Sequence, residues 1–179
     1  MALVHPNSRK CTKSELDLFE VPPRYWEQKG LTSALSDQGP YEFAVCGAGD
    51  DYIDLVNTYL LVEAQIVADD DTVLDTGADV GHVNLWMYSL FSDVSVSLNE
   101  TLVSPPTSLY PYRAYMETLL SYGPAAKESQ LTGVMLYKDT TRNQDKRATD
   151  NKGFTSRKSL TAQSNSLQMM GKLYLDLFC

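Results

Sequence analysis

The sequence predicts an all-β fold with minor helices, arranged as an antiparallel β-sandwich. Three features predict it: short segments in which apolar and polar residues alternate, one clear hairpin, and few segments with helical spacing. Alternation with a period of two residues is typical of strands with one buried face. Several such strands joined by turns indicate a sandwich. We divide the chain into an N-terminal extended arm over residues 1–40 and a β-sandwich over residues 41–179.

The arm is rich in proline and glycine, which favour turns over regular structure. It contains one apolar cluster, formed by Leu16, Leu18, Phe19 and Val21. We expect the arm to dock on the sandwich through this cluster, because chain ends are ordered only where they are tied down.

Four segments carry the strand pattern of the predicted sandwich. Residues 41–45 alternate between apolar and polar side chains, and residues 51–68 continue the pattern as one long or bent strand. Residues 93–103 form the clearest hairpin, with its turn at Asn99-Glu100. Residues 173–178 form a last apolar strand directly before the end of the chain. Because the chain stops inside this strand, we expect the sandwich to be incomplete and truncated at its C-terminus.

One amphipathic helix is predicted over residues 112–122, and Gly123-Pro124 ends it. Its apolar residues recur at intervals of three and four, while Arg113 and Glu117 fall on the other side. These apolar residues are Tyr112, Tyr115, Met116, Leu119 and Leu120. Residues 125–131 are a candidate for a second short helix.

Two further segments lack a clear strand pattern. Residues 84–91 are apolar on several faces, which fits either a buried helical turn or a strand. Residues 139–166 are polar, with no large apolar residue except Phe154 and Leu160. This composition predicts a long solvent-exposed loop within the sandwich.

The charge and cysteine content exclude several classes of protein. The formal net charge is −8 and the pI is about 4.7, which argues against a dedicated nucleic-acid binder or a polybasic membrane anchor. No apolar run approaches the roughly 20 residues that span a bilayer, and we expect no signal peptide, because the first residues contain no long apolar stretch. The cysteines and histidines are few and far apart, so we expect no disulfide scaffold, no metal site and a reducing compartment. They are Cys11, Cys46, Cys179, His5 and His82.

Asp75-Thr76-Gly77-Ala78 matches the motif of retroviral-type aspartic proteases. In those enzymes two aspartates, one from each subunit, share a proton and activate water. Met169–Lys172 is similar to a segment near the end of the same proteases. The glycine-rich flap hairpin that they need between the two elements is missing here. The alternative is an Asp-rich turn, in which Asp and Gly supply the turn geometry. We therefore predict that the protein is not an enzyme and has no catalytic, cofactor-binding or metal-ligating residue. Under the protease alternative, Asp75 would be the catalytic residue.

Several longer strings resemble the double jelly-roll capsid proteins of Polinton/Maverick elements and the related adintoviruses. The resemblance covers nearly the whole chain but only the N-terminal portion of that family. Its main segments are Leu16–Phe19, Val21–Pro23, Asp51–Leu55, Ser89–Val94 and, most closely, Tyr110–Gly123. It implies that the sandwich is of the jelly-roll type, that the protein is a structural capsid subunit, and that it assembles with itself, as a trimer when intact.

The sequence leaves three functions open. The first is a capsid-type protein from a virus-like mobile element, with a place in the virion, or otherwise inside the cell. The second is the aspartic protease built on Asp75. The third is a β-sandwich recruited by the host as a binding module. Its tyrosines would stack on a ligand, although core or subunit packing is more common at this spacing. These tyrosines are Tyr110, Tyr112, Tyr115 and Tyr122.

Overall fold

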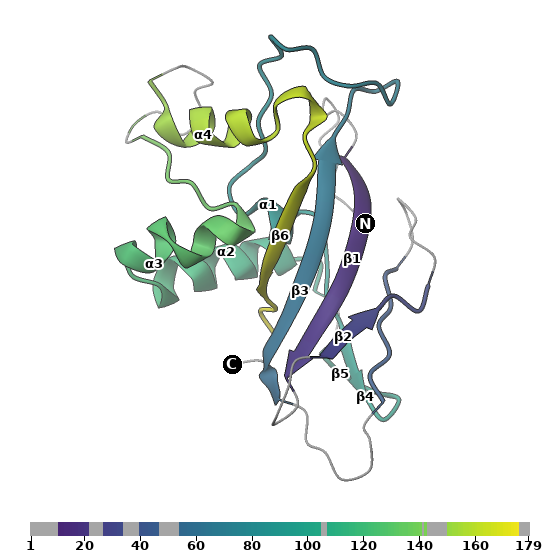
Figure 1. The fold of residues 1–179 in the computed structure, drawn as a ribbon. Helices are drawn as coiled ribbons and strands as arrows, with labels where there is room; N and C mark the ends of the chain where they lie inside the picture. Colours follow the sequence, from purple (N-terminus) through teal and green to yellow (C-terminus); the bar gives the residue numbers. More distant parts are fainter. Residues whose placement is uncertain are drawn as a thin grey trace.

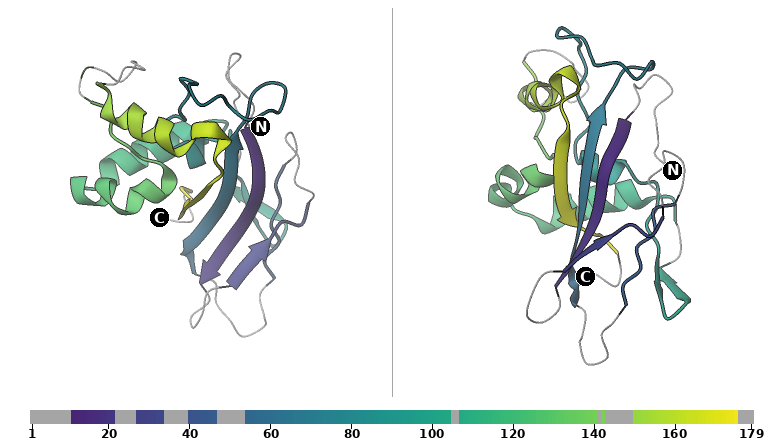
Figure 2. Two further views of the ribbon diagram at one scale, coloured as in Figure 1. Left: turned by 45° about the horizontal axis from the view of Figure 1, so that its top comes forward. Right: turned by 45° about the vertical axis from the view of Figure 1, so that its right-hand side comes forward.

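The computed structural model describes residues 11–21, 27–33, 40–46, 54–104, 107–140, 142 and 150–175. Within these ranges the chain forms six strands, four α-helices and two 3-10 helices. A curved antiparallel sheet runs through the molecule, and the helices gather beside the sheet at its β6 edge (Figure 1). A small separate hairpin lies on the β2 side (Figures 1 and 2).

The main sheet has four strands in the order β2-β1-β3-β6. Their bounds are β1 Cys11–Val21, β2 Glu27–Gly30, β3 Asp54–Ile66 and β6 Leu167–Lys172. Strand β3 lies between β1 and β6 and pairs antiparallel with both. Its side chains alternate in burial, as a period of two requires. Val62 lies opposite Met169, and both are completely buried.

Helices cover the buried face of β3 and β6. Helix α1 (Trp86–Ser89) and the 3-10 helix η1 (Gln130–Val134) both contact β6. Gly171 permits this close approach, because a Cβ atom there would collide with Val134 Cγ1 and with the Tyr88 hydroxyl. The Tyr88 hydroxyl in turn donates a hydrogen bond of 3.0 Å to the Lys172 carbonyl. One core therefore joins the sheet to the helices.

The remaining elements extend from this core. They are β4 Val96–Leu98, β5 Thr101–Ser104, α2 Tyr110–Ser121, α3 Pro124–Glu128, α4 Lys152–Leu160 and η2 Ala162–Ser164. Strands β4 and β5 form the second sheet, an antiparallel hairpin. Asn99 and Glu100 turn it with φ angles of 47° and 64°, the geometry of a type I′ turn.

The predicted fold class is wrong. The described residues form a mixed domain of sheets and helices, not an all-β sandwich of the jelly-roll type. The physical reason is that helices, rather than a second large sheet, pack on the face of β3 and β6. The only other sheet within the described ranges is the two-stranded β4–β5 hairpin.

Several local predictions had mixed outcomes. The hairpin at Asn99-Glu100 and the helix near 112–122 are confirmed, and the 84–91 alternative resolves as a helical turn. Residues 41–45 pack three half-buried side chains on the core but form no strand. The C-terminal strand lies earlier than predicted, at β6, and residues 176–179 fall outside the described ranges.

Two predicted irregular regions contain regular structure. Strands β1 and β2 lie within residues 1–40, which we predicted as an extended arm. Helix α4 lies within residues 139–166, which we predicted as a loop. Residues 1–10 of the arm, like 141 and 143–149 of the loop, are outside the described part. No helix among the described residues is long and apolar enough to cross a membrane.

Candidate functional site

Helix α2 meets the core through a narrow stripe of side chains. Tyr110, Ala114 and Thr118 are spaced four residues apart and are at most 2% exposed. Two of the three are small, so the helix axis lies close to the core. The Thr118 hydroxyl donates a hydrogen bond of 2.9 Å to the Tyr174 hydroxyl, and the Tyr110 ring packs edge-on against Tyr88. This stripe fixes the rotation of α2 about its own axis.

The opposite side of α2 is apolar and faces outward. Leu120 is 79% exposed and Tyr112 is 69% exposed. We call this surface the α2 face and define it as Leu109, Tyr112, Tyr115, Met116, Leu119 and Leu120. At roughly 200 Å² for each fully exposed large side chain, the α2 face exposes on the order of 700 Å². The largest apolar patch of an ordinary monomer is about 300–600 Å², so this face lies at or above the upper end of that range.

An ion pair borders the α2 face along one side. Arg113 Nε donates to Glu117 Oε1 at 2.6 Å, and the two side chains are 31% and 30% exposed. At the far end, Lys127 of α3 donates through Nζ to the Leu119 carbonyl at 2.8 Å. These polar contacts lie on the helix backbone and on its flank. They leave the apolar side chains of the α2 face uncovered.

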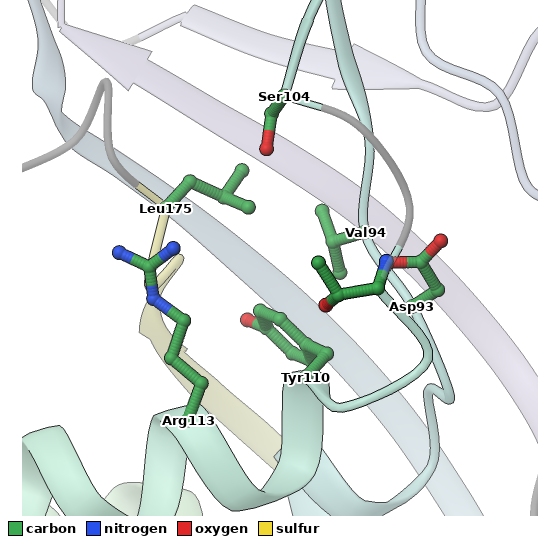
Figure 3. A pocket seen from close by; sticks show the side chains of 7 residues that line it. Asp93, Val94, Ser104, Tyr110, Arg113 and Leu175 are labelled. Atoms are coloured by element: carbon green, nitrogen blue, oxygen red, sulfur yellow. The ribbon is translucent and has the colours of Figure 1, made fainter.

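A small pocket lies between the base of the β4–β5 hairpin and the first turn of α2 (Figure 3). It has a volume of about 70 Å³. Its walls are Asp93, Val94, Ser104, Thr107, Tyr110, Arg113 and Leu175. The Asp93 carboxylate accepts a hydrogen bond of 3.3 Å from the Thr107 amide. The buried Tyr110 hydroxyl makes no hydrogen bond within the described part of the chain, and burial raises its pKa above the ordinary value.

The pocket has little capacity for chemistry. Its volume is far below the roughly 300–1,000 Å³ of typical ligand sites. A tyrosine with a raised pKa stays protonated at neutral pH and does not act as a base. No cluster of three or more His, Cys, Asp or Glu side chains suited to a metal ion occurs among the described residues.

The structure places Asp75 in an exposed turn after β3. The Asp75 carbonyl accepts a hydrogen bond of 2.9 Å from the Ala78 amide, which closes the turn. Thr76 Oγ1 accepts from Gln163 Nε2 at 3.1 Å, and Asp79 pairs with Lys158 of α4 at 2.8 Å. The motif therefore joins this turn to the α4–η2 region. A turn at Asp75 is expected under both alternatives, so the protease remains a prediction.

A buried arginine is the side chain that sequence reasoning missed. Arg157 of α4 is 5% exposed, although it lies in the segment predicted as a solvated loop. Its guanidinium donates to the His82 and Tyr137 carbonyls and to the Asn84 amide oxygen, and it pairs with Asp139 at 2.8 Å. This network anchors α4 on the core. The sequence signal was Asn151, whose side chain caps α4 by accepting from the Phe154 amide.

His82 is buried beside the same network. Its ring stacks on Trp86 with the centroids 5.0 Å apart, and Nδ1 lies 2.9 Å from the Val83 carbonyl. Burial, followed by the nearby Arg157 charge, lowers the pKa of His82 to about 4. A neutral imidazole is therefore part of the folded core.

The predicted tyrosines separate into two groups. Tyr110 is buried and Tyr122 packs against the core, whereas Tyr112 and Tyr115 belong to the α2 face. The structure thus brings the exposed tyrosines together with Met116, Leu119 and Leu120 on one surface. The α2 face is the candidate functional site, and it is suited to contact rather than to catalysis.

Comparison with known proteins identifies one similar sequence. The chain is 26% identical over 160 residues to an uncharacterized protein of Caenorhabditis elegans, F54H12.2. The match covers 85% of this chain and 36% of the worm protein, so the chain spans about a third of that relative. No protein-family model matches the chain. No solved structure matches it.

Proposed function

We propose that the protein is a structural, capsid-type subunit that acts by assembling with copies of itself. The exposed α2 face is the single observation that carries this proposal. It offers a large apolar surface, and the pocket beside it is too small for a typical substrate. The proposal does not depend on a jelly-roll sandwich.

The resemblance of the sequence supports the same function. Its strongest segment, Tyr110–Gly123, contains all of α2 and every residue of the α2 face except Leu109. A subunit of a shell works through surfaces that repeat by symmetry, and such surfaces need shape and apolar area. The trimeric capsomer and the place in a virion are implied by the resemblance and belong to the proposal. The assembly of a longer protein, of which this chain would be a part, is proposed on the same basis.

The test is the mass of the protein in solution, measured by sedimentation velocity over a wide range of concentration. We expect the mass to rise with concentration for the wild type and to stay at that of a monomer for Leu120→Lys. Val73→Lys is the matched control, because Val73 is 66% exposed but lies outside the α2 face. A wild type that stays monomeric at every concentration would overturn the proposal.

A binding module is the second candidate, and the exposure of Tyr112 and Tyr115 favours it. In that case the α2 face would bind a different protein rather than a second copy. Tyr112→Ala with Tyr115→Ala would then abolish saturable binding of that protein while the fold stays intact. A monomeric wild type with such binding would favour this candidate over self-assembly.

A further inference from the structure

The ion pair on the border of the α2 face is placed so that two copies of the chain can exchange it. We propose that two copies pack α2 against α2 in antiparallel orientation about a two-fold axis, so that Arg113 of each copy meets Glu117 of the other. This inference rests on the proposed function, because it names one contact through which copies of the chain associate.

The shape of the apolar surface indicates another helix as its occupant. The α2 face follows the helix from Leu109 to Leu120, with members spaced three and four residues apart. Such a stripe runs nearly parallel to the helix axis for about 17 Å, at 1.5 Å per residue. A second helix packed along the stripe would bury all of it, with the side-chain ridges of one helix in the grooves of the other. A second copy of the chain offers a helix with the same stripe.

The area fits a contact between two copies. The α2 face exposes on the order of 700 Å², and a standard interface buries about 800 Å² on each side. The stripe that holds α2 to its own core, formed by Tyr110, Ala114 and Thr118, lies on the opposite side of the helix. The apolar side chains of the contact between copies are therefore not those that hold α2 to its own core.

Charge selects the antiparallel orientation. Arg113 and Glu117 are four residues apart and lie on the same border of the α2 face. In an antiparallel pair of helices this border of one copy lies against the same border of the other copy. In a parallel pair it lies against the opposite border of the other copy. A two-fold axis near Tyr115 exchanges position 113 with position 117. Each arginine then meets a glutamate of the other copy, and one contact is formed twice.

The decisive test mixes two charge variants. Arg113→Glu has two acidic side chains on the border, and Glu117→Arg has two basic ones. We expect each variant alone to associate roughly tenfold more weakly than the wild type, because like charges meet across the axis. An equimolar mixture should form heterodimers at close to wild-type affinity. Native mass spectrometry distinguishes the heterodimer from each homodimer.

Mixing separates the contact between copies from the fold of each copy. Both variants lack the internal ion pair, alone or mixed, so a gain on mixing comes only from the contact between copies. The matched control is the exposed pair of Lys158 and Asp79, away from the α2 face. Lys158→Glu and Asp79→Lys should associate as the wild type does, with no preference for heterodimers.

A cross-link tests the axis independently. Tyr115→Cys, with Ser in place of Cys11, Cys46 and Cys179, should oxidise to a covalent dimer, while Val73→Cys in the same background should not. If the wild type associates but the mixture gains nothing and Tyr115→Cys does not cross-link, the two-fold contact is wrong and self-assembly stands. Loss of association in Leu102→Lys instead would assign the contact to the β4–β5 hairpin. A monomeric wild type overturns both proposals.

Discussion

The Thr118 hydroxyl of α2 donates a hydrogen bond of 2.9 Å to the hydroxyl of Tyr174, which follows β6 in the chain. Both side chains are buried, and Thr118 lies on the stripe that faces the core. This bond therefore helps to fix which side of α2 turns inward. The apolar side turns outward as a consequence, and the rotation of α2 creates the α2 face.

Removing this bond should weaken the fold. Thr118→Val keeps the shape of the side chain but leaves the Tyr174 hydroxyl without its donor. We expect the free energy of unfolding to fall by roughly 1 kcal/mol, measured by urea denaturation. Thr101→Val is the control, because Thr101 is exposed in β5 and its loss should change the value by less than about 0.5 kcal/mol. An unchanged stability in Thr118→Val would contradict this role.

Arg157 should be among the most sensitive positions of the chain. Arg157→Met leaves the Asp139 carboxylate, 12% exposed, without its cation and leaves two backbone carbonyls without donors. Breaking a buried ion pair by removing one partner costs about 3–5 kcal/mol. Lys158→Met breaks the exposed pair with Asp79 and should cost less than about 1 kcal/mol. Equal losses in the two variants would show that the Arg157 network is not structural.

Acid should destabilise the protein through His82. Its pKa in the folded protein is about 4, below the value of 6.5 for a free imidazole. Between these values the unfolded chain binds a proton that the folded chain excludes, so stability is complete above pH 6.5 and falls as the pH drops toward 4. The loss should reach up to roughly 3 kcal/mol. The free energy of unfolding, measured by denaturation at several pH values across this range, should depend less on pH in His82→Gln than in the wild type. An equal dependence on pH in the two proteins would exclude His82 as the cause.

A paired glycine substitution tests the packing of the helices on β6. Gly171→Ala forces a Cβ atom against Val134 and Tyr88, and we expect a loss of about 1–3 kcal/mol in the free energy of unfolding. Gly77→Ala should change it by less than about 0.5 kcal/mol, because nothing lies within 4 Å of the added atom. If Gly171→Ala is as stable as Gly77→Ala, the close approach is not needed.

The elements that the sequence predicted are those with a strong local signal. The Asn99-Glu100 turn lies between two alternating segments, and the apolar residues of α2 recur with helical spacing. Periodicity identified the apolar side of α2 but not which side of the helix packs on the core. The side that faces the core is formed by Tyr110, Ala114 and Thr118, which are not a conspicuous apolar stripe in the sequence.

The elements that the sequence missed depend on distant contacts. Helix α4 has no apolar stripe, and it is anchored by Arg157 through groups 18 to 75 residues away. Such a network leaves no periodic pattern, so the segment resembled a loop. Strand β6 was placed too late because Leu173 and Leu175 continue the apolar pattern beyond Lys172. The missed helix α4 belongs to the layer beside the sheet, and the misplaced β6 is an edge strand of the main sheet, so both omissions contributed to the wrong fold class.

The most direct test of the account is the solution mass of the wild type and of Leu120→Lys, compared by sedimentation velocity as the concentration rises. The account predicts that the wild type grows beyond 20.0 kDa while Leu120→Lys remains a folded monomer. A wild type that stays at 20.0 kDa throughout, with the same profile as Leu120→Lys, would contradict it.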